Sequence, residues 1–141
     1  MKGINPLGYS GTPLAKKLGI KRGQRVKLFH PPEGYFDLFE DLPDDFELLP
    51  EEDTGIDFIH YFALQADQLD RDLGTLRKQL NQTGMIWISW PKKASKVPTD
   101  LDGNVVRDLG LRHGLVDIKV CSVNEIWSAL KFVIPVRDRT A

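Results

Sequence analysis

The most constraining feature of this chain is an almost wholly apolar run at residues 85–89, Met-Ile-Trp-Ile-Ser, which ends abruptly in a lysine-rich loop. A strand that is apolar on both faces is typical of a parallel sheet with helices on both sides. In open sheets of this kind, ligands bind beyond the carboxyl ends of the strands. The loop at residues 90–100 therefore lies where a functional site is expected.

The rest of the chain alternates between strand and helix patterns, which indicates an α/β fold. The clearest helix covers residues 66–80, where leucines spaced three and four apart form one apolar stripe. We expect a Rossmann-like three-layer sandwich whose mostly parallel sheet ends in a C-terminal antiparallel hairpin. The expected strands are residues 25–29, 46–49, 56–62, 85–89, 116–123 and 128–134; the other helical segments are a short helix capped by Thr12 with Pro13 at its first position, a turn within residues 33–45 and a helix capped by Thr99.

Length and composition predict one cytoplasmic domain. The chain has 141 residues, and no apolar run in it approaches the roughly 20 residues that cross a bilayer. Residues 1–20 lack the apolar core of a signal peptide, and Cys121 is the single cysteine, which excludes an internal disulfide. We expect residues 1–24 to form an arm and short helix packed on an α/β domain of residues 25–141.

The charges are segregated along the chain. Residues 1–27 hold seven Lys or Arg and no acid, residues 28–70 hold thirteen Asp or Glu and no Lys or Arg, and residues 71–141 hold twelve bases and seven acids. Such blocks can form oppositely charged faces that attract nucleic acid, anionic ligands or a second copy of the chain. Equally, basic and acidic elements can lie against each other in the fold, so both interpretations stay open.

The lysine-rich loop is the best candidate for a ligand site. Its ammonium groups can neutralise phosphates, and the free amides of a following helix add a partial positive charge. An aromatic ring beside such lysines can stack on a base, so phosphorylated small molecules and nucleic acid are the partners to consider. The alternative is a solvated linker. The anion-site candidates are Trp90, Lys92, Lys93, Ser95, Lys96 and Thr99.

The remaining polar residues give weaker signals. The basic segment between Lys16 and Lys27 either extends the lysine surface or lies on the sheet with its charges in water. His30 and His60 belong to strands expected to be neighbours, and one of them could act as a general base or a metal ligand. Neither has a second ligand at metal-binding spacing, so packed or half-exposed histidines and no metal are expected. Ser10 has no identifiable base, and no standard catalytic or nucleotide-binding motif is present.

The order of elements over residues 25–134 resembles class I S-adenosylmethionine methyltransferases, which have parallel strands and a closing antiparallel hairpin. Residues 80–89, Leu-Asn-Gln-Thr-Gly-Met-Ile-Trp-Ile-Ser, resemble that family's helix–loop–strand step. The resemblance implies an S-adenosylmethionine cofactor near Glu33 and Gly34, with Glu51 or Glu52 accepting ribose hydroxyls.

One loop departs from the methyltransferase pattern. The family places an acidic residue and a glycine-rich turn after the first strand, whereas residues 29–35 here read Phe-His-Pro-Pro-Glu-Gly-Tyr. Pro31 and Pro32 have no N–H to donate, and only Gly34 keeps the freedom of glycine. This departure predicts a degenerate methyltransferase-like fold without the usual cofactor cradle.

Two further phrases resemble a family of small bacterial proteins that consist of a domain of unknown function. They are residues 8–20, Gly-Tyr-Ser-Gly-Thr-Pro-Leu-Ala-Lys-Lys-Leu-Gly-Ile, and residues 90–100, Trp-Pro-Lys-Lys-Ala-Ser-Lys-Val-Pro-Thr-Asp. That resemblance implies no activity. The leading expectation is a non-catalytic binding or regulatory module that recognises an anion at the lysine loop and needs no cofactor. The alternatives are a divergent S-adenosylmethionine-dependent methyltransferase and a structural interaction domain, with self-association open.

Overall fold

A computed structural model describes residues 12–49 and 54–140. The expected arm at residues 1–11, with Ser10, and the acidic turn at 50–53, with Glu51 and Glu52, lie outside the described residues.

One six-stranded sheet has the order β2-β1-β3-β4-β6-β5. The strands are β1 (Arg25–Phe29), β2 (Glu47–Leu48), β3 (Ile56–Phe62), β4 (Leu80–Pro91), β5 (Val116–Ser122) and β6 (Trp127–Val133); the helices are α1 (Leu14–Leu18), α2 (Ala66–Gln79) and α3 (Gly103–Arg112), with short 3₁₀ turns η1 (Tyr35–Leu38), η2 (Lys93–Ser95) and η3 (Val136–Asp138).

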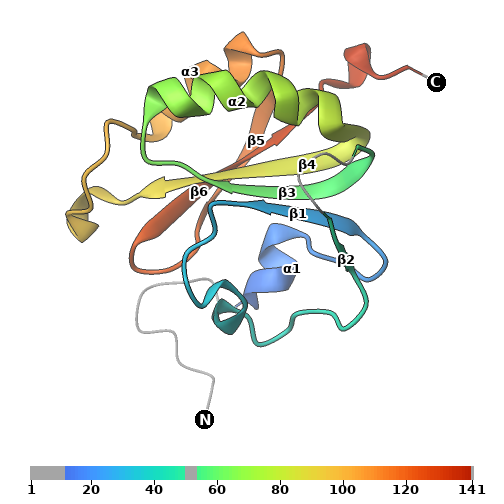
Figure 1. Cartoon of the computed structure of the whole chain (residues 1–141), viewed down its shortest axis with the longest axis horizontal. Helices are drawn as coiled ribbons and strands as arrows, with labels where there is room; N and C mark the ends of the chain where they lie inside the picture. Colours follow the sequence, from blue (N-terminus) through green and yellow to red (C-terminus); the bar gives the residue numbers. More distant parts are fainter. Residues whose placement is uncertain (1–11, 50–53, 141) are drawn as a thin grey trace.

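The sheet is mostly parallel, and its antiparallel strands are the last two in the chain. Strands β1 to β4 pair in parallel, whereas β6 runs antiparallel to both β4 and β5. Helices α2 and α3 cover one face, and α1 lies on the other (Figure 1). The prediction of a three-layer α/β fold with a C-terminal antiparallel hairpin is therefore confirmed.

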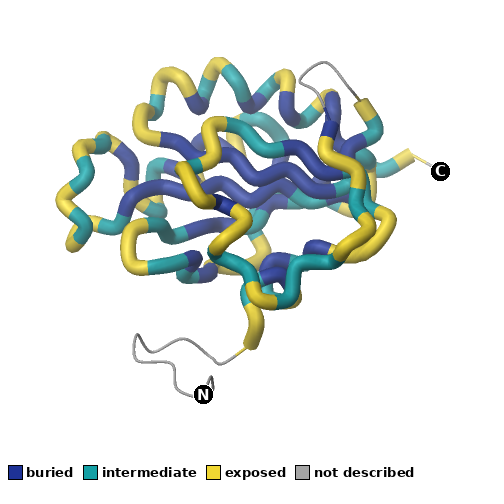
Figure 2. The backbone as a smooth tube through the Cα atoms, turned by 60° about the horizontal axis from the view of Figure 1, so that its bottom comes forward, coloured by how far each residue is buried: buried dark blue, intermediate teal, exposed yellow. Residues whose placement is uncertain are grey.

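Two apolar cores lie on the two faces of the sheet. On the α2 and α3 side, Leu69, Leu73 and Leu76 are buried against odd-numbered residues of β3. On the α1 side, Phe58 and Trp87 pack with residues of α1. Figure 2 shows the central strands buried and α2 alternating between buried and exposed positions. This alternation is expected of a helix that turns one apolar stripe to the core.

The strand β4 begins directly where α2 ends, and this differs from the loop expected between the helix at residues 66–80 and the strand at residues 85–89. The helix ends at Gln79, and Leu80 already pairs with Ile56 of β3. The register between β3 and β4 shifts just beyond this pair, and there a Cβ on Gly84 would lie 2.9 Å from the Ile56 carbonyl oxygen. The glycine is needed for a close backbone approach within a longer strand, not for a turn.

Helix α1 is capped from a distance and not by Thr12. Pro13 occupies the N-cap position and makes no side-chain cap bond. The Asp41 carboxylate accepts hydrogen bonds from the Ala15 and Lys16 amides, both at 3.0 Å. A carboxylate at the start of a helix satisfies its free amides and suits its dipole. Asp41 thus fixes α1 to the segment that follows η1.

Replacing Asp41 with Ala is expected to lower the free energy of unfolding by about 1–2 kcal/mol, because two helix amides lose their acceptor. Urea unfolding followed by circular dichroism measures this loss. Asp44→Ala is the matched control, since Asp44 is exposed in the same segment. Equal midpoints for the two variants would refute the distant cap.

No helix among residues 12–49 and 54–140 combines the length and the apolar character that crossing a bilayer requires.

Candidate functional site

Three loops meet at the carboxyl edge of the parallel strands. They follow β1, β3 and β4, which lie side by side in the order β1-β3-β4 (Figure 1). The right-handed crossovers of such sheets bring these loops to one edge. This edge is where ligands of open α/β sheets bind.

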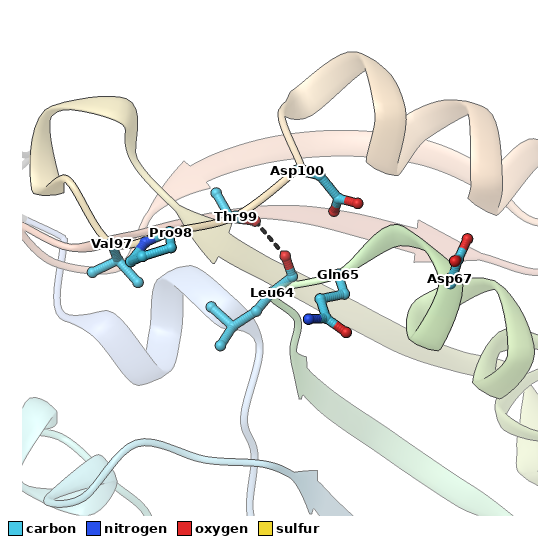
Figure 3. Close-up of a pocket in the computed structure, with 7 residues that line it drawn as sticks. All are labelled: Leu64, Gln65, Asp67, Val97, Pro98, Thr99 and Asp100. Atoms are coloured by element: carbon cyan, nitrogen blue, oxygen red, sulfur yellow. Dashed lines mark hydrogen bonds between the residues drawn. The ribbon is translucent and has the colours of Figure 1, made fainter.

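A cavity of about 700 Å³ lies between the loops that follow β3 and β4. The first loop leads into α2, and the second leads toward α3 (Figure 3). Cofactor and small-molecule sites usually measure roughly 300–1,000 Å³. The lining residues are Leu64, Gln65, Asp67, Val97, Pro98, Thr99 and Asp100.

Hydrogen bonds hold the two loops together. The Thr99 hydroxyl donates to the Leu64 carbonyl oxygen at 2.6 Å, and the Asp100 carboxylate accepts from the Ala66 amide at 2.8 Å (Figure 3 shows the first). Thr99 was expected to cap the following helix, but that helix starts at Gly103. Its cap is Asp102, whose carboxylate accepts from the Val105 amide at 2.9 Å. Thr99 instead bridges two loops, so the cavity walls are preformed.

The charge of this cavity is negative. Asp67 and Asp100 are both exposed, and no described Lys or Arg is among the lining residues. Figure 3 shows the Asp100 side chain directed toward the start of α2, where Asp67 lies. Two carboxylates facing one space favour a ligand that carries positive charge or several hydroxyl donors.

A second cavity, of about 540 Å³, adjoins the first and shares Val97, Thr99 and Asp100 with it. It brings together four of the six residues predicted for an anion site. These are Trp90, Lys92, Lys93 and Thr99, whereas Ser95 and Lys96 are not among its lining residues.

Several of the predicted anion-site groups are already engaged within the protein. Trp90 is only 8% exposed and packs against the start of α3 at Gly103. The Lys92 ammonium group donates to the Ser122 hydroxyl at 2.6 Å, and the Ser95 hydroxyl donates to the Lys92 carbonyl oxygen. The indole of Trp90 is therefore part of the core rather than a surface for stacking a base. Lys93 and Lys96 are exposed.

The loop after β1 is built differently from a glycine-rich cradle. His30 has a φ of 55°, in the left-handed region, and lines a smaller cavity of about 310 Å³ beside Asp72. Gly34 has a φ of 76°, and the Tyr35 amide donates back to the Pro32 carbonyl oxygen. Only Glu33 and Gly34 of the predicted cofactor residues are described, and both are exposed at the edge.

A buried polar network anchors this loop to the sheet. The Tyr35 hydroxyl is hydrogen-bonded to His60 Nδ1 at 2.9 Å, and His60 Nε2 is hydrogen-bonded to the Ser89 hydroxyl at 2.7 Å. Burial lowers the pKa of His60 to about 3 and raises the pKa of Tyr35. The network is neutral and closed to solvent, as expected for a packed histidine. Sequence reasoning placed His60 beside His30 but had no signal for Tyr35 or Ser89 as partners.

Among the described residues, no group of three or more His, Cys, Asp or Glu side chains is placed to hold a metal ion.

Comparisons with known proteins support the fold and not a sequence family. No protein-family model matches the sequence, and no curated protein matches it. Solved structures do match. A methyltransferase dependent on S-adenosylmethionine (SAM) from Aquifex aeolicus aligns with a TM-score of 0.64 and 15% identity over 85% of this chain and 87% of that one. A putative type 11 methyltransferase from Sulfolobus solfataricus aligns with a TM-score of 0.61 and 13% identity over 91% and 93% of the two chains.

A third match contains the cofactor. Aeropyrum pernix fibrillarin, solved in complex with natively bound S-adenosyl-L-methionine, aligns with a TM-score of 0.58 and 11% identity over 85% of this chain and 73% of that one. The methyltransferase-like fold predicted from the order of elements is thereby confirmed. The likeness to small bacterial domains of unknown function gains no support, since no family model matches.

These matches correct the leading functional expectation. A non-catalytic module without a cofactor was expected because the loop after β1 lacks glycines. Two of the structures that share this fold are described as methyltransferases, and the third, a fibrillarin, holds the cofactor. The expectations of a non-enzyme, of no cofactor and of an anion-binding module are therefore wrong as the main reading, and the methyltransferase alternative is the better supported.

Proposed function

We propose that this chain is a divergent methyltransferase that binds S-adenosylmethionine between the loops that follow β3 and β4. The single observation that carries the proposal is the preformed acidic cavity of about 700 Å³ at the carboxyl edge of a methyltransferase-like sheet. When bound, the cofactor supplies a methyl group on a positively charged sulfur.

The chemistry of the cavity suits this cofactor. S-adenosylmethionine has a sulfonium, an ammonium group and two ribose hydroxyls, all of which favour carboxylate partners. Asp67 and Asp100 supply carboxylates, while Leu64, Val97 and Pro98 supply apolar surface for a purine. Leu64 is 45% exposed, so it is available for such a contact.

The loop after β1 does not suit the cofactor in the same way. Pro31 and Pro32 cannot donate hydrogen bonds, and the side chain of Tyr35 fills the space beneath the loop. Tyr35 packs there against Phe39 and Phe62. We therefore assign the holding residues to the β3 and β4 loops, with Glu33 and Gly34 at most at the margin.

The second cavity supplies the place for a methyl acceptor. It adjoins the cofactor cavity across Thr99 and Asp100, and it presents Lys92, Lys93 and Ser128 from the other side. These groups would orient an acceptor beside the cofactor.

Calorimetry with S-adenosylmethionine and with S-adenosylhomocysteine tests the proposal. Asp67→Asn keeps the shape of the side chain and removes its charge, so we expect binding to weaken by roughly five- to tenfold, in line with loss of one partly exposed charge contact. Asp108→Asn, at an exposed position of α3, is the matched control and should bind as the parent does.

Two results would contradict the proposal. If neither compound produces heat of binding at millimolar concentration, the proposal of a methyltransferase is wrong. Equal affinities of the Asp67 and Asp108 variants would show that the cofactor does not occupy this cavity.

A further inference from the structure

Lysines that are distant in sequence gather on the α1 side of the sheet. The Lys17 ammonium group of α1 donates to the Ser122 carbonyl oxygen at 3.3 Å, and Lys92 of the loop after β4 donates to the hydroxyl of the same serine at 2.6 Å. Ser122 ends β5, so this strand joins the two basic segments. We call Lys17, Lys21, Lys119 and Lys131 the basic face. Lys92 lies beside it, because the Ser122 hydroxyl, like Val120, projects on the opposite side of the sheet.

Two of these lysines face each other across a strand pair. Lys119 of β5 is the register partner of Lys131 of β6. Lys119 is two positions from Cys121 on β5, and Lys131 is two positions from Ala129 on β6. Cys121 and Ala129 belong to the α1-side core, and side chains two apart on a strand point the same way, so both lysines project on that side of the sheet. Like charges directly opposite on antiparallel strands are destabilising. The fold therefore retains a repulsive pair.

The surroundings do not neutralise this repulsion. Burial lowers the pKa of Lys131, and the charges of Lys119 and Lys21 lower it further. In the described part of the chain, Lys21, Lys92, Lys119 and Lys131 form no ion pair with a carboxylate. Lysines that form no such ion pair attract a polyanion.

We infer that the basic face binds the phosphate backbone of a nucleic acid. The lysines come from α1, the turn that follows it, β5 and β6, so their ammonium groups are carried by separate elements. Separate ammonium groups spread over a face match a row of phosphates better than one small phosphorylated molecule.

The basic face also leads to the proposed active site. Lys92 lies at its margin and lines the second cavity, which adjoins the cofactor cavity. This step rests on the proposed function: because the basic face continues into the second cavity, a nucleic acid is the class of molecule that would accept the methyl group.

A lipid surface fits less well. Membrane binding needs apolar side chains beside the charges. The exposed apolar residues of β5, Ile118 and Val120, are 55% and 66% exposed but alternate with Lys119 and so project on the opposite face.

The test measures binding of a short fluorescent single-stranded RNA, and of the DNA of the same sequence, over a range of salt concentrations. Lys119→Gln with Lys131→Gln should weaken binding at least about tenfold at low salt and reduce the salt slope by roughly 1.4, because single strands lose about 0.7 per phosphate contact. The matched control, Arg71→Gln with Lys78→Gln on the α2 side, removes equal charge and should change affinity less than about twofold.

Folding and cofactor binding are measured on the same double variant. Its unfolding midpoint should rise by about 1–4 °C, because the repulsive pair is gone, so weaker binding cannot be ascribed to unfolding. Its affinity for S-adenosylmethionine should equal that of the parent.

The inference is overturned if neither nucleic acid binds, if only anionic vesicles or a second copy of the chain bind, or if the Lys119 and Lys131 variant binds as the control does. If the parent binds nucleic acid but does not bind S-adenosylmethionine, the proposed function alone is refuted. Cofactor binding without nucleic-acid binding would refute this inference alone.

Discussion

Lowering the pH from 7 to 5 is expected to reduce the free energy of unfolding by about 2 kcal/mol through His60 alone. Burial lowers the pKa of His60 in the folded chain to about 3, whereas the unfolded chain has an ordinary histidine near 6.5. Below pH 6.5 the unfolded chain takes up a proton that the folded chain excludes. Stability is therefore fully present above that pH and falls as the pH drops toward 3, where the loss reaches roughly 4 kcal/mol.

Urea unfolding at a series of pH values checks this expectation. His60→Gln keeps a polar side chain between Tyr35 and Ser89 but cannot take up the proton. The difference between the two pH profiles isolates His60, because all other titrating groups are shared. Parallel profiles for the parent and the variant between pH 7 and pH 5 would contradict a buried neutral histidine.

The sheet could be predicted from sequence because its cause is local. Apolar runs and amphipathic stripes define strands and helices wherever they occur, and crossover handedness then limits the topology. The prediction matched β1 and β3 at residues 25–29 and 56–62. Boundaries were less certain where contacts decide them, as in β4, which extends from Leu80 to Pro91.

The distant partners could not be predicted. Asp41 caps α1 across 25 and 26 residues of sequence, and Tyr35 meets His60 across 25. Neither pairing has a spacing rule, because only the folded sheet brings the segments together. The same holds for Thr99, whose place before a helix suggested a cap but whose hydroxyl reaches the end of β3.

The wrong expectation that the chain needs no cofactor had a physical origin as well. No cofactor was expected because prolines in the loop after β1 remove hydrogen-bond donors. The carboxyl edge of a parallel sheet has several loops, and the acidic cavity is formed by two others. Asp67 and Asp100 gave no usable signal, because an acidic residue near a helix start is favoured by the helix dipole alone.

A glycine in α3 marks a close approach of this helix to the sheet. A Cβ on Gly110 would lie 2.2 Å from Cε1 of Phe132, a ring that is fully buried in β6. Gly74 of α2 has room instead, because its nearest contact for a Cβ is His113 Nδ1 at 3.9 Å. The same substitution is therefore expected to act in opposite directions in the two helices.

Gly110→Ala should lower the free energy of unfolding by about 2–3 kcal/mol, because either α3 or the Phe132 ring must move within a packed core. Gly74→Ala should raise it by roughly 0.5–1 kcal/mol, since alanine is the better helix former. Urea unfolding measures both, and Phe132→Leu combined with Gly110→Ala should recover part of the loss by removing the clashing ring edge. If Gly110→Ala were as stable as Gly74→Ala, α3 would not approach β6 as closely as the contact at Phe132 requires.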